Sequence, residues 1–120
     1  MTTKTMKNQT DKLFDLEELL NIAAGDDVFI AEMISLFISL NETALLEIRN
    51  QIVTRDYSKI KAILHKMKPS VIVMGVSSLI EIIEQVEQTE LSAMKEPVFS
   101  ILMLKLEKTL QEVNEQLRLL

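Results

Sequence analysis

Glycine and proline, the residues that interrupt regular helices most strongly, are scarce in this chain: its 120 residues include two of each. Strand and hairpin proteins need more turn residues than this, and more alternation of β-branched or aromatic side chains with polar ones. Aromatic residues make up only 4% of the chain, whereas Leu, Ile, Met, Glu and Lys dominate, a composition typical of helices. The composition therefore predicts an all-α protein.

Residues that cap or end helices divide the chain into five expected helices. Acidic residues precede three of them, glycines end two, and a proline begins the last. The expected helices cover about residues 15–24, 27–54 and 57–74, a segment around 79–86, and about 97–120. The residues that mark these limits are Asp15 with Glu18 (a possible capping box), Gly25, Asp26, Asp27, Asp56, Gly75 and Pro97.

Each of the four later segments carries apolar residues every three or four positions, which gives a helix one apolar face. Four such helices joined by short connections bury these faces best as an antiparallel four-helix bundle with up-down-up-down topology, and the short N-terminal helix is expected to cover one end. We expect residues 1–12 to form a flexible tail and residues 13–120 one domain. The apolar faces consist of Ile30, Met33, Phe37, Leu40, Ala44, Leu45, Ile48 and Ile52; Ile60, Ile63, Leu64, Met67, Val71 and Met74; Leu79, Ile82, Ile83 and Val86; and Phe99, Leu102, Met103, Leu106, Leu110, Val113, Leu117 and Leu120.

Several classes of site are excluded by composition. The chain has no Cys and a single His, so disulfides, thiol catalysis and metal sites built from several histidines are ruled out. A formal net charge of −5 disfavours non-specific binding to nucleic acid. No apolar run approaches the roughly 18 residues that span a bilayer, and no signal peptide opens the chain. We therefore expect a cytoplasmic domain without membrane insertion or a nucleic-acid partner.

One segment, RDYSKIKAILHKMK over residues 55–68, differs from the rest in its charge. It contains five Lys or Arg residues and one Asp, a net charge of +4, which leaves −9 for the remainder of the chain. The only histidine, His65, lies within it. A basic cluster in an acidic chain indicates that an anion is handled there.

A helical wheel places His65 about 140° from Ile60, well away from the apolar face. We therefore expect the imidazole to reach solvent among ammonium groups and small or apolar side chains. The alternative is an ordinary surface histidine among solubilising lysines. The residues one turn away from His65 are Lys61, Ala62, Lys68 and Pro69.

Pro69 cannot donate a backbone hydrogen bond to the carbonyl of His65, and its ring crowds that carbonyl. Because Val71 and Met74 continue the apolar face beyond it, a kinked helix is favoured over a helix that ends at the proline. Ile72, on the otherwise polar side, is the kind of exposed apolar residue that a partner-docking patch needs.

The string Leu64-His65-Lys66-Met67-Lys68-Pro69-Ser70, with Gly75 ten residues after the histidine, resembles the signature of a histidine-containing phosphotransfer (HPt) domain. That signature has a His, a Lys three residues later, then a small residue, a Ser, and a Gly further on. The segment LFDLEELLNIAAGDDVFIAEMISLFISLNETALLEI is similar to the leading short helix, Gly-Asp turn and first bundle helix of the family. The resemblance covers about residues 13–118 and implies a four-helix bundle with an exposed phospho-accepting histidine.

Carried over by position, the resemblance implies that His65 is phosphorylated, that Lys68 steadies the phosphoryl group and that Lys66 adds positive charge. Ser70 matches a polar position near the site, and Gly75 would allow the helix ends to approach closely. This chain has Pro69 where Gly is commonest in the family, and Val71 and Ile72 where small polar residues are often found. The residues expected to contact a partner are Lys61, Ala62, Pro69, Ser70 and Ile72.

Imidazole in its neutral form is a competent nucleophile near neutral pH. Two glycines are too few for a Walker A motif or a kinase Gly-rich loop, so we expect a phosphocarrier without autokinase activity and without a bound cofactor. The resemblance implies that the phosphoryl group comes from, and leaves to, receiver domains of response regulators or hybrid sensor kinases. Mg²⁺ would be bound by the receiver, and the chain is expected to be a monomer.

Two other functions stay open on the sequence. One is a helical interaction module without phosphate chemistry, in which the last helix serves self-association. The other is a hydrolase using Ser58 or Ser70 with His65 and an acid, although no nucleophile elbow accompanies them. Acidic residues of the second and fourth helices are interpreted as solvated faces: Glu32, Glu42, Glu47, Glu81, Glu84 and Glu87.

Overall fold

The computed structural model describes residues 12–120, and within that range all regular structure is helical. The all-α prediction is confirmed. Residues 1–11 of the predicted tail (residues 1–12) lie outside the described range, and its last residue, Lys12, is exposed. The elements are α2 (Glu17–Ala23), α3 (Asp27–Thr54), α4 (Tyr57–Val73), α5 (Ser77–Gln88), a short 3-10 helix η1 (Leu91–Ala93) and α6 (Val98–Arg118).

Capping side chains set the starts of α3 and α4, as predicted. Asp26 Oδ1 accepts a hydrogen bond from the backbone N–H of Phe29 at 3.0 Å, and Asp56 Oδ1 accepts one from Lys59 at 3.2 Å. The helix expected from Asp15 begins instead at Glu17. The reason is local: Asp15 Oδ1 accepts from the backbone N–H of Glu17 at 3.0 Å, only two residues on, which forms a turn and not a helix cap.

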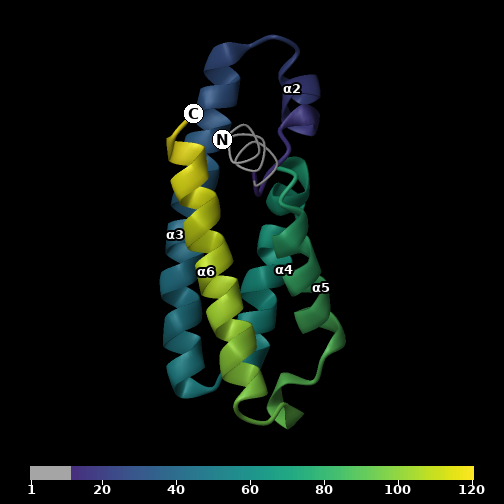
Figure 1. Cartoon of the computed structure of the whole chain (residues 1–120), viewed down its shortest axis with the longest axis vertical. Helices are drawn as coiled ribbons and strands as arrows, with labels where there is room; N and C mark the ends of the chain where they lie inside the picture. The colour runs from purple at the N-terminus through teal and green to yellow at the C-terminus, as the bar shows by residue number, and fades with distance from the viewer. Residues whose placement is uncertain (1–11) are drawn as a thin grey trace, which may run out of the picture.

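The helices α3, α4, α5 and α6 pack side by side, and each runs opposite to the one before it (Figure 1). α4 lies against α3 and α5, α6 lies against α5 and returns to α3, and α2 packs on α3. The core is therefore enclosed by residues from every long helix. It includes every apolar residue predicted for α5. It also includes every apolar residue predicted for the last helix except Leu120, which follows α6 and is 62% exposed.

The apolar face predicted for α3 is partly wrong. Leu40 is 47% exposed, whereas its neighbour Asn41 is 1% exposed. The amide of Asn41 is directed into the helix interface, where its Nδ2 donates to Asn114 Oδ1 of α6 at 2.9 Å. Asn114 Nδ2 in turn donates to the backbone carbonyl of Ile38 at 3.1 Å. The hydrophobic periodicity therefore predicted a buried Leu40, whereas the core contains the hydrogen-bonded pair Asn41 and Asn114.

The glycine after α4 is required by close packing of the chain. Gly75 has φ +63°, and a Cβ added there would lie 2.2 Å from the carbonyl oxygen of Asp15. The backbone N–H of Asp15 also donates to the carbonyl oxygen of Gly75 at 3.1 Å. The segment before α2 therefore crosses directly over the turn between α4 and α5, so the close approach at Gly75 is that of Asp15.

Helix α3 is a candidate membrane span among the described helices, although it contains no uninterrupted apolar run of 18 residues. An 18-residue window of α3 has a mean hydropathy of 1.5, so the helix is long and apolar enough, by length and composition alone, to cross a membrane. Polar residues interrupt its apolar stretches, so no uninterrupted apolar run is that long, yet the mean stays at 1.5. Only 22% of the window is buried. The exposed large apolar residues of α3 are Val28, Leu36, Leu40, Leu46 and Val53.

Candidate functional site

His65 lies near the middle of α4 on its outer face. The buried residues Ile60, Leu64 and Val71 hold the opposite face of the helix against the core, and each has 0% exposure. Because helix geometry ties the direction of each side chain to that of its neighbours, the imidazole is carried outward. The His65 side chain is 78% exposed, which agrees with the helical wheel.

A carboxylate from the neighbouring helix holds the imidazole. Glu87 Oε2 of α5 lies 2.8 Å from His65 Nδ1, and Glu87 Oε1 accepts a hydrogen bond from Lys68 Nζ, also at 2.8 Å. Glu84 Oε2 lies 3.9 Å from the same ammonium group. The interpretation of Glu87 as part of a solvated face is therefore wrong, since its side chain is 26% exposed and bridges two residues of the candidate site.

This contact determines which ring nitrogen is available for chemistry. An ionised carboxylate can only accept hydrogen bonds, so in the neutral ring the proton must be on Nδ1, from which it is donated to Glu87. The lone pair is then on Nε2, on the far side of the ring from Glu87. An exposed imidazole fixed in this tautomer presents one nucleophilic nitrogen to an incoming group.

The charges of the cluster stabilise one another. The hydrogen bond to Glu87 raises the pKa of Lys68 above its usual range. The hydrogen bond from Lys68, followed by that from His65, lowers the pKa of Glu87 below its usual range. Lys68 and Glu87 are therefore both ionised at neutral pH. In this arrangement the Lys68 ammonium contacts the carboxylate, and the carboxylate contacts the ring.

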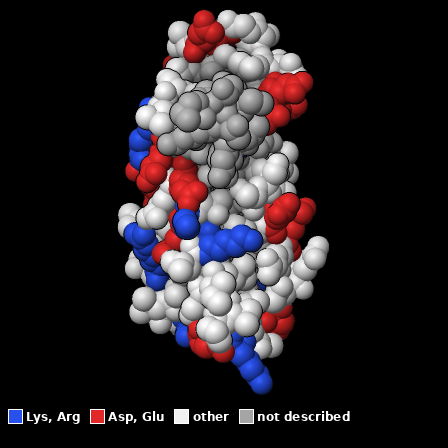
Figure 2. Space-filling view, viewed as in Figure 1, with Lys and Arg blue, Asp and Glu red and all other residues white. Residues whose placement is uncertain are grey.

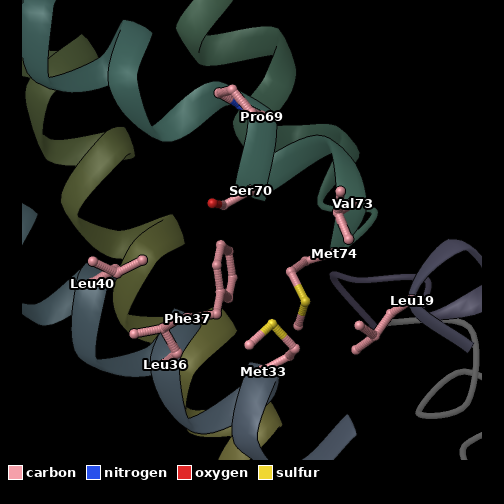
Figure 3. Close-up of a pocket in the computed structure, with 9 residues that line it drawn as sticks. All are labelled: Leu19, Met33, Leu36, Phe37, Leu40, Pro69, Ser70, Val73 and Met74. Carbon is pink, nitrogen blue, oxygen red and sulfur yellow. The ribbon is translucent and has the colours of Figure 1, made fainter. Parts of the chain in front are cut away.

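The other residues expected around the site lie on the same helix. α4 continues through Pro69 to Val73, so the prediction that the helix extends beyond the proline is confirmed. Ala62, Lys66 and Pro69 are exposed, and Ile72 is 51% exposed. Lys61 and Ser70 are half-buried. Ser70 faces α3 and not the His65 side of the helix (Figure 3). The other residues of the predicted set form a mixed apolar and basic surface around His65.

The positive charge expected over residues 55–68 is partly neutralised in the fold. Arg55 pairs with Glu96 at 3.3 Å, and Lys59 pairs with Asp56 at 3.8 Å. Together with the Lys68 pair, these contacts leave Lys61 and Lys66 as the lysines of the segment for which no acidic partner lies within 4 Å in residues 12–120. Figure 2 shows charged side chains of both signs scattered over the face that it presents.

An apolar hollow adjoins the site between α3 and α4. In Figure 3 the Phe37 ring points from α3 toward Ser70, and the side chains of Met33 and Met74 point toward each other. A second hollow continues along the same pair of helices and shares Phe37, Leu40 and Ser70 with the first. We call this surface the α3–α4 groove. Its first hollow is lined by Leu19, Met33, Leu36, Phe37, Leu40, Pro69, Ser70, Val73 and Met74.

Sequence reasoning missed both Glu87 and the groove. A signal for the groove was present, because Leu36 lies one turn before Leu40 and widens the apolar face of α3. A weaker signal for Glu87 was present too, since Glu84 and Glu87 are spaced three apart, as are His65 and Lys68, so each pair shares a helix face. Within the described residues no group of three or more His, Asp or Glu could hold a metal ion.

Comparison with protein-family models, with curated proteins and with solved structures finds no match to this chain.

Proposed function

We propose that this chain is an HPt-type phosphocarrier that accepts a phosphoryl group on His65 from an aspartyl-phosphate receiver domain and passes it to another receiver. The observation that carries the proposal is an exposed imidazole whose Nδ1 is held by Glu87 at 2.8 Å, which leaves Nε2 free to attack. An ordinary surface histidine needs no such fixed orientation.

The helix arrangement supports the proposal. Successive long helices run in opposite directions and close a ring of contacts from α3 to α6 (Figure 1). We assign this arrangement to residues 13–120 as an antiparallel four-helix bundle with up-down-up-down topology and α2 at one end. Such a bundle presents a residue near the middle of one helix on a rigid scaffold, which is what a reaction between two proteins requires.

Phosphoryl transfer depends mostly on positioning and on cations, because its transition state is loose and spreads charge over three oxygens. Lys68 lies one turn after His65, and Glu87 holds its ammonium group close to the ring. Lys66 is exposed on the same helix. In the proposed reaction both lysines supply positive charge to the transferring group.

The partner is proposed to be a receiver domain. No nucleotide-binding loop can be built from two glycines, so the phosphoryl group must come from another protein, and the chain is proposed to act as a carrier without a cofactor of its own. Exposed Ala62, Pro69 and Ile72 leave room around the ring, and the α3–α4 groove offers an apolar surface beside it. We propose a monomer in the cytoplasm, with Mg²⁺ bound by the receiver and without nucleic-acid binding or membrane insertion.

The test is transfer from a phosphorylated receiver domain in the presence of Mg²⁺. Wild-type chain should acquire an acid-labile label, and His65→Gln should acquire none. Lys68→Met should slow the transfer with helicity unchanged by circular dichroism. Ser58→Ala, an exposed change on the same helix, is the matched control and should be labelled at the wild-type rate. Full labelling of His65→Gln would rule out the proposed function.

A second candidate, an interaction module without phosphate chemistry, is favoured by the exposed apolar side chains of three helices. Leu20 on α2, Leu46 on α3 and Ile101 on α6 are each at least 52% exposed. Single exposed apolar side chains are ordinary, so this candidate needs neighbouring ones, such as Leu36 and Leu40 one turn apart on α3. Sedimentation would support this candidate if the chain formed a stable oligomer that shielded His65 from modification.

A further inference from the structure

Orienting the His65 ring does not by itself require the negative charge that the Glu87 carboxylate carries. It contacts His65 Nδ1 through one oxygen and Lys68 Nζ through the other, both at 2.8 Å. A neutral hydrogen-bond acceptor at this place would also hold the ring and select the same tautomer. The carboxylate adds a negative charge in contact with the nitrogen opposite the reactive one. That charge acts on the ring after Nε2 has reacted.

We propose that Glu87 keeps the proton on Nδ1 of the phosphorylated ring and so makes the phosphoryl group on Nε2 of His65 easier to release. This inference rests on the proposed function in one respect, that His65 carries the phosphoryl group. Glu87 is a positioning residue in this role, because it contacts the ring and not the transferred group.

The bonding changes explain why the charge matters. When Nε2 attacks phosphorus, its lone pair forms the N–P bond, and the O–P bond of the aspartyl phosphate breaks with its electron pair left on the aspartyl carboxylate. The Nδ1 proton stays in place, so the ring becomes a cation whose charge Glu87 balances at hydrogen-bond distance. The donor loses one phosphoryl group, the ring gains it, and no proton has to leave the site.

Release of the phosphoryl group reverses these steps, and its rate depends on whether Nδ1 carries a proton. The electrons of the N–P bond return to Nε2 as the phosphoryl group leaves for an acceptor. From a ring protonated on Nδ1 the leaving group is neutral imidazole. From an unprotonated ring it would be the imidazolate anion, which is a far poorer leaving group. A group that keeps the proton in place therefore keeps the phosphoryl group transferable.

The other charged groups near the ring do not supply this effect. The lysines on α4 are positive and oppose protonation of the ring, and Lys68 is itself balanced by Glu87 and, at 3.9 Å, by Glu84. Glu87 is the acidic group in hydrogen-bonding contact with the ring. The charged residues that face this part of α4 are Lys61, Lys66 and Lys68 on α4 itself, Glu84 and Glu87 on α5, and Glu47 on α3, across the groove from Lys66.

The test uses a small phosphoryl donor, so that it does not depend on any receiver. Phosphoramidate transfers its phosphoryl group to imidazole nitrogen, its own P–N bond breaking to release ammonia, and the chain offers a single histidine. The labelled protein is freed of donor, and loss of the label is followed by ³¹P NMR at a series of pH values. Loss should be fast at low pH, where the ring is protonated, and should slow as the pH rises.

In Glu87→Gln the midpoint of this profile of label loss against pH should move to lower pH. An opposite charge within about 4–6 Å shifts a titration by about 1–3 pH units, so above both midpoints the label should persist about tenfold longer or more in the variant. At low pH the two profiles should converge. Glu87→Asp, which keeps the charge, should retain the wild-type profile.

Two controls separate the ring from its surroundings. Glu81→Gln makes the same change of net charge on an exposed part of α5 and should leave the profile in place. Glu87→Gln also releases Lys68, so the comparison is repeated in a Lys68→Met background, where the displacement should persist. Circular dichroism confirms that each variant is folded.

Three results would overturn the inference: coincident profiles for the wild type and Glu87→Gln, an equal displacement by Glu81→Gln, or no labelling of wild-type His65 by phosphoramidate. A displaced profile in a chain that accepts nothing from any phosphorylated receiver would instead leave the role of Glu87 intact and remove the proposed function. The two failures are therefore distinguishable.

Discussion

His65 Nδ1 and Glu87 Oε2 lie 2.8 Å apart although 22 residues separate them in the chain. The contact joins the exposed face of α4 to the edge of α5, so the orientation of the imidazole depends on how these two helices pack. A histidine oriented only by its own helix would keep its rotamer freedom. The relationship makes the candidate site a property of the tertiary fold.

The pKa of Glu87 should respond to Lys68 more than to any other lysine. Its pKa is lowered first by the Lys68 hydrogen bond, so this cluster stabilises the fold above the unfolded-state pKa and loses that contribution as the pH falls through the lower folded pKa. In Lys68→Met the pKa of Glu87 should rise toward the ordinary value of a glutamate, because its largest lowering contact is lost. Side-chain NMR titration measures it. Lys61→Met is the matched control, and an equal rise there would contradict the assignment.

Gly75→Ala should destabilise the protein strongly. The new Cβ would lie 2.2 Å from the Asp15 carbonyl oxygen, and φ at +63° is already unfavourable for alanine. The left-handed conformation alone costs about 1 kcal/mol, and the overlap adds to it, so we expect a loss of more than about 2 kcal/mol in the free energy of unfolding. Urea denaturation measures this loss.

The other glycine of the chain is its control. Gly25 has φ +88° and nothing within 4 Å of an added Cβ, so Gly25→Ala should cost only about 1 kcal/mol. Equal losses for the two variants would show that conformation, and not the approach of Asp15, explains the effect.

The paired amides of Asn41 and Asn114 should be strongly coupled in stability. Asn114→Leu leaves the buried Nδ2 of Asn41 without its acceptor, which costs about 1–3 kcal/mol. The double variant Asn41→Leu, Asn114→Leu removes both polar groups and should be more stable than the sum of the single losses predicts. A double-mutant cycle from thermal or urea unfolding gives the coupling, and strict additivity would contradict it.

Comparing α3 with the later helices shows which buried residues can be predicted from the sequence and which cannot. The polar and apolar residues of α5 segregate cleanly, so Ile82, Ile83 and Val86 were placed in the core correctly. α3 is apolar around much of its circumference. Hydrophobic periodicity therefore could not tell that Leu40 is exposed and that Asn41 is buried, because packing against α4 and α6 decides it.

The candidate site likewise has one feature that the sequence predicts and others that depend on how the helices pack. Exposure of His65 follows from the pattern of α4 alone, and a helical wheel finds it. The contact with Glu87 depends on the rotation of α5 about its own axis relative to α4, and no single helix pattern contains that rotation. The neutralisation of Arg55 by Glu96 depends likewise on where the connection before α6 passes.

The α3–α4 groove should matter for docking and little for stability. Leu40 lines both hollows and is 47% exposed, so Leu40→Ser should change the free energy of unfolding by less than about 0.5–1 kcal/mol. Transfer from a phosphorylated receiver should nevertheless slow several-fold. Leu46→Ser, also on α3 but outside the groove, should transfer at the wild-type rate. Equal rates for the two variants would exclude the groove from the docking surface.

The nitrogen that carries the label tests the central claim most directly. After reaction with a phosphorylated receiver domain and Mg²⁺, ¹H–¹⁵N and ³¹P NMR of the isotope-labelled chain distinguish phosphate on Nε2 from phosphate on Nδ1. We expect a single phosphohistidine, on Nε2 of His65. A label on Nδ1, a label on any other residue, or an unmodified chain would contradict the claim that Glu87 leaves Nε2 of His65 as the phosphoryl acceptor.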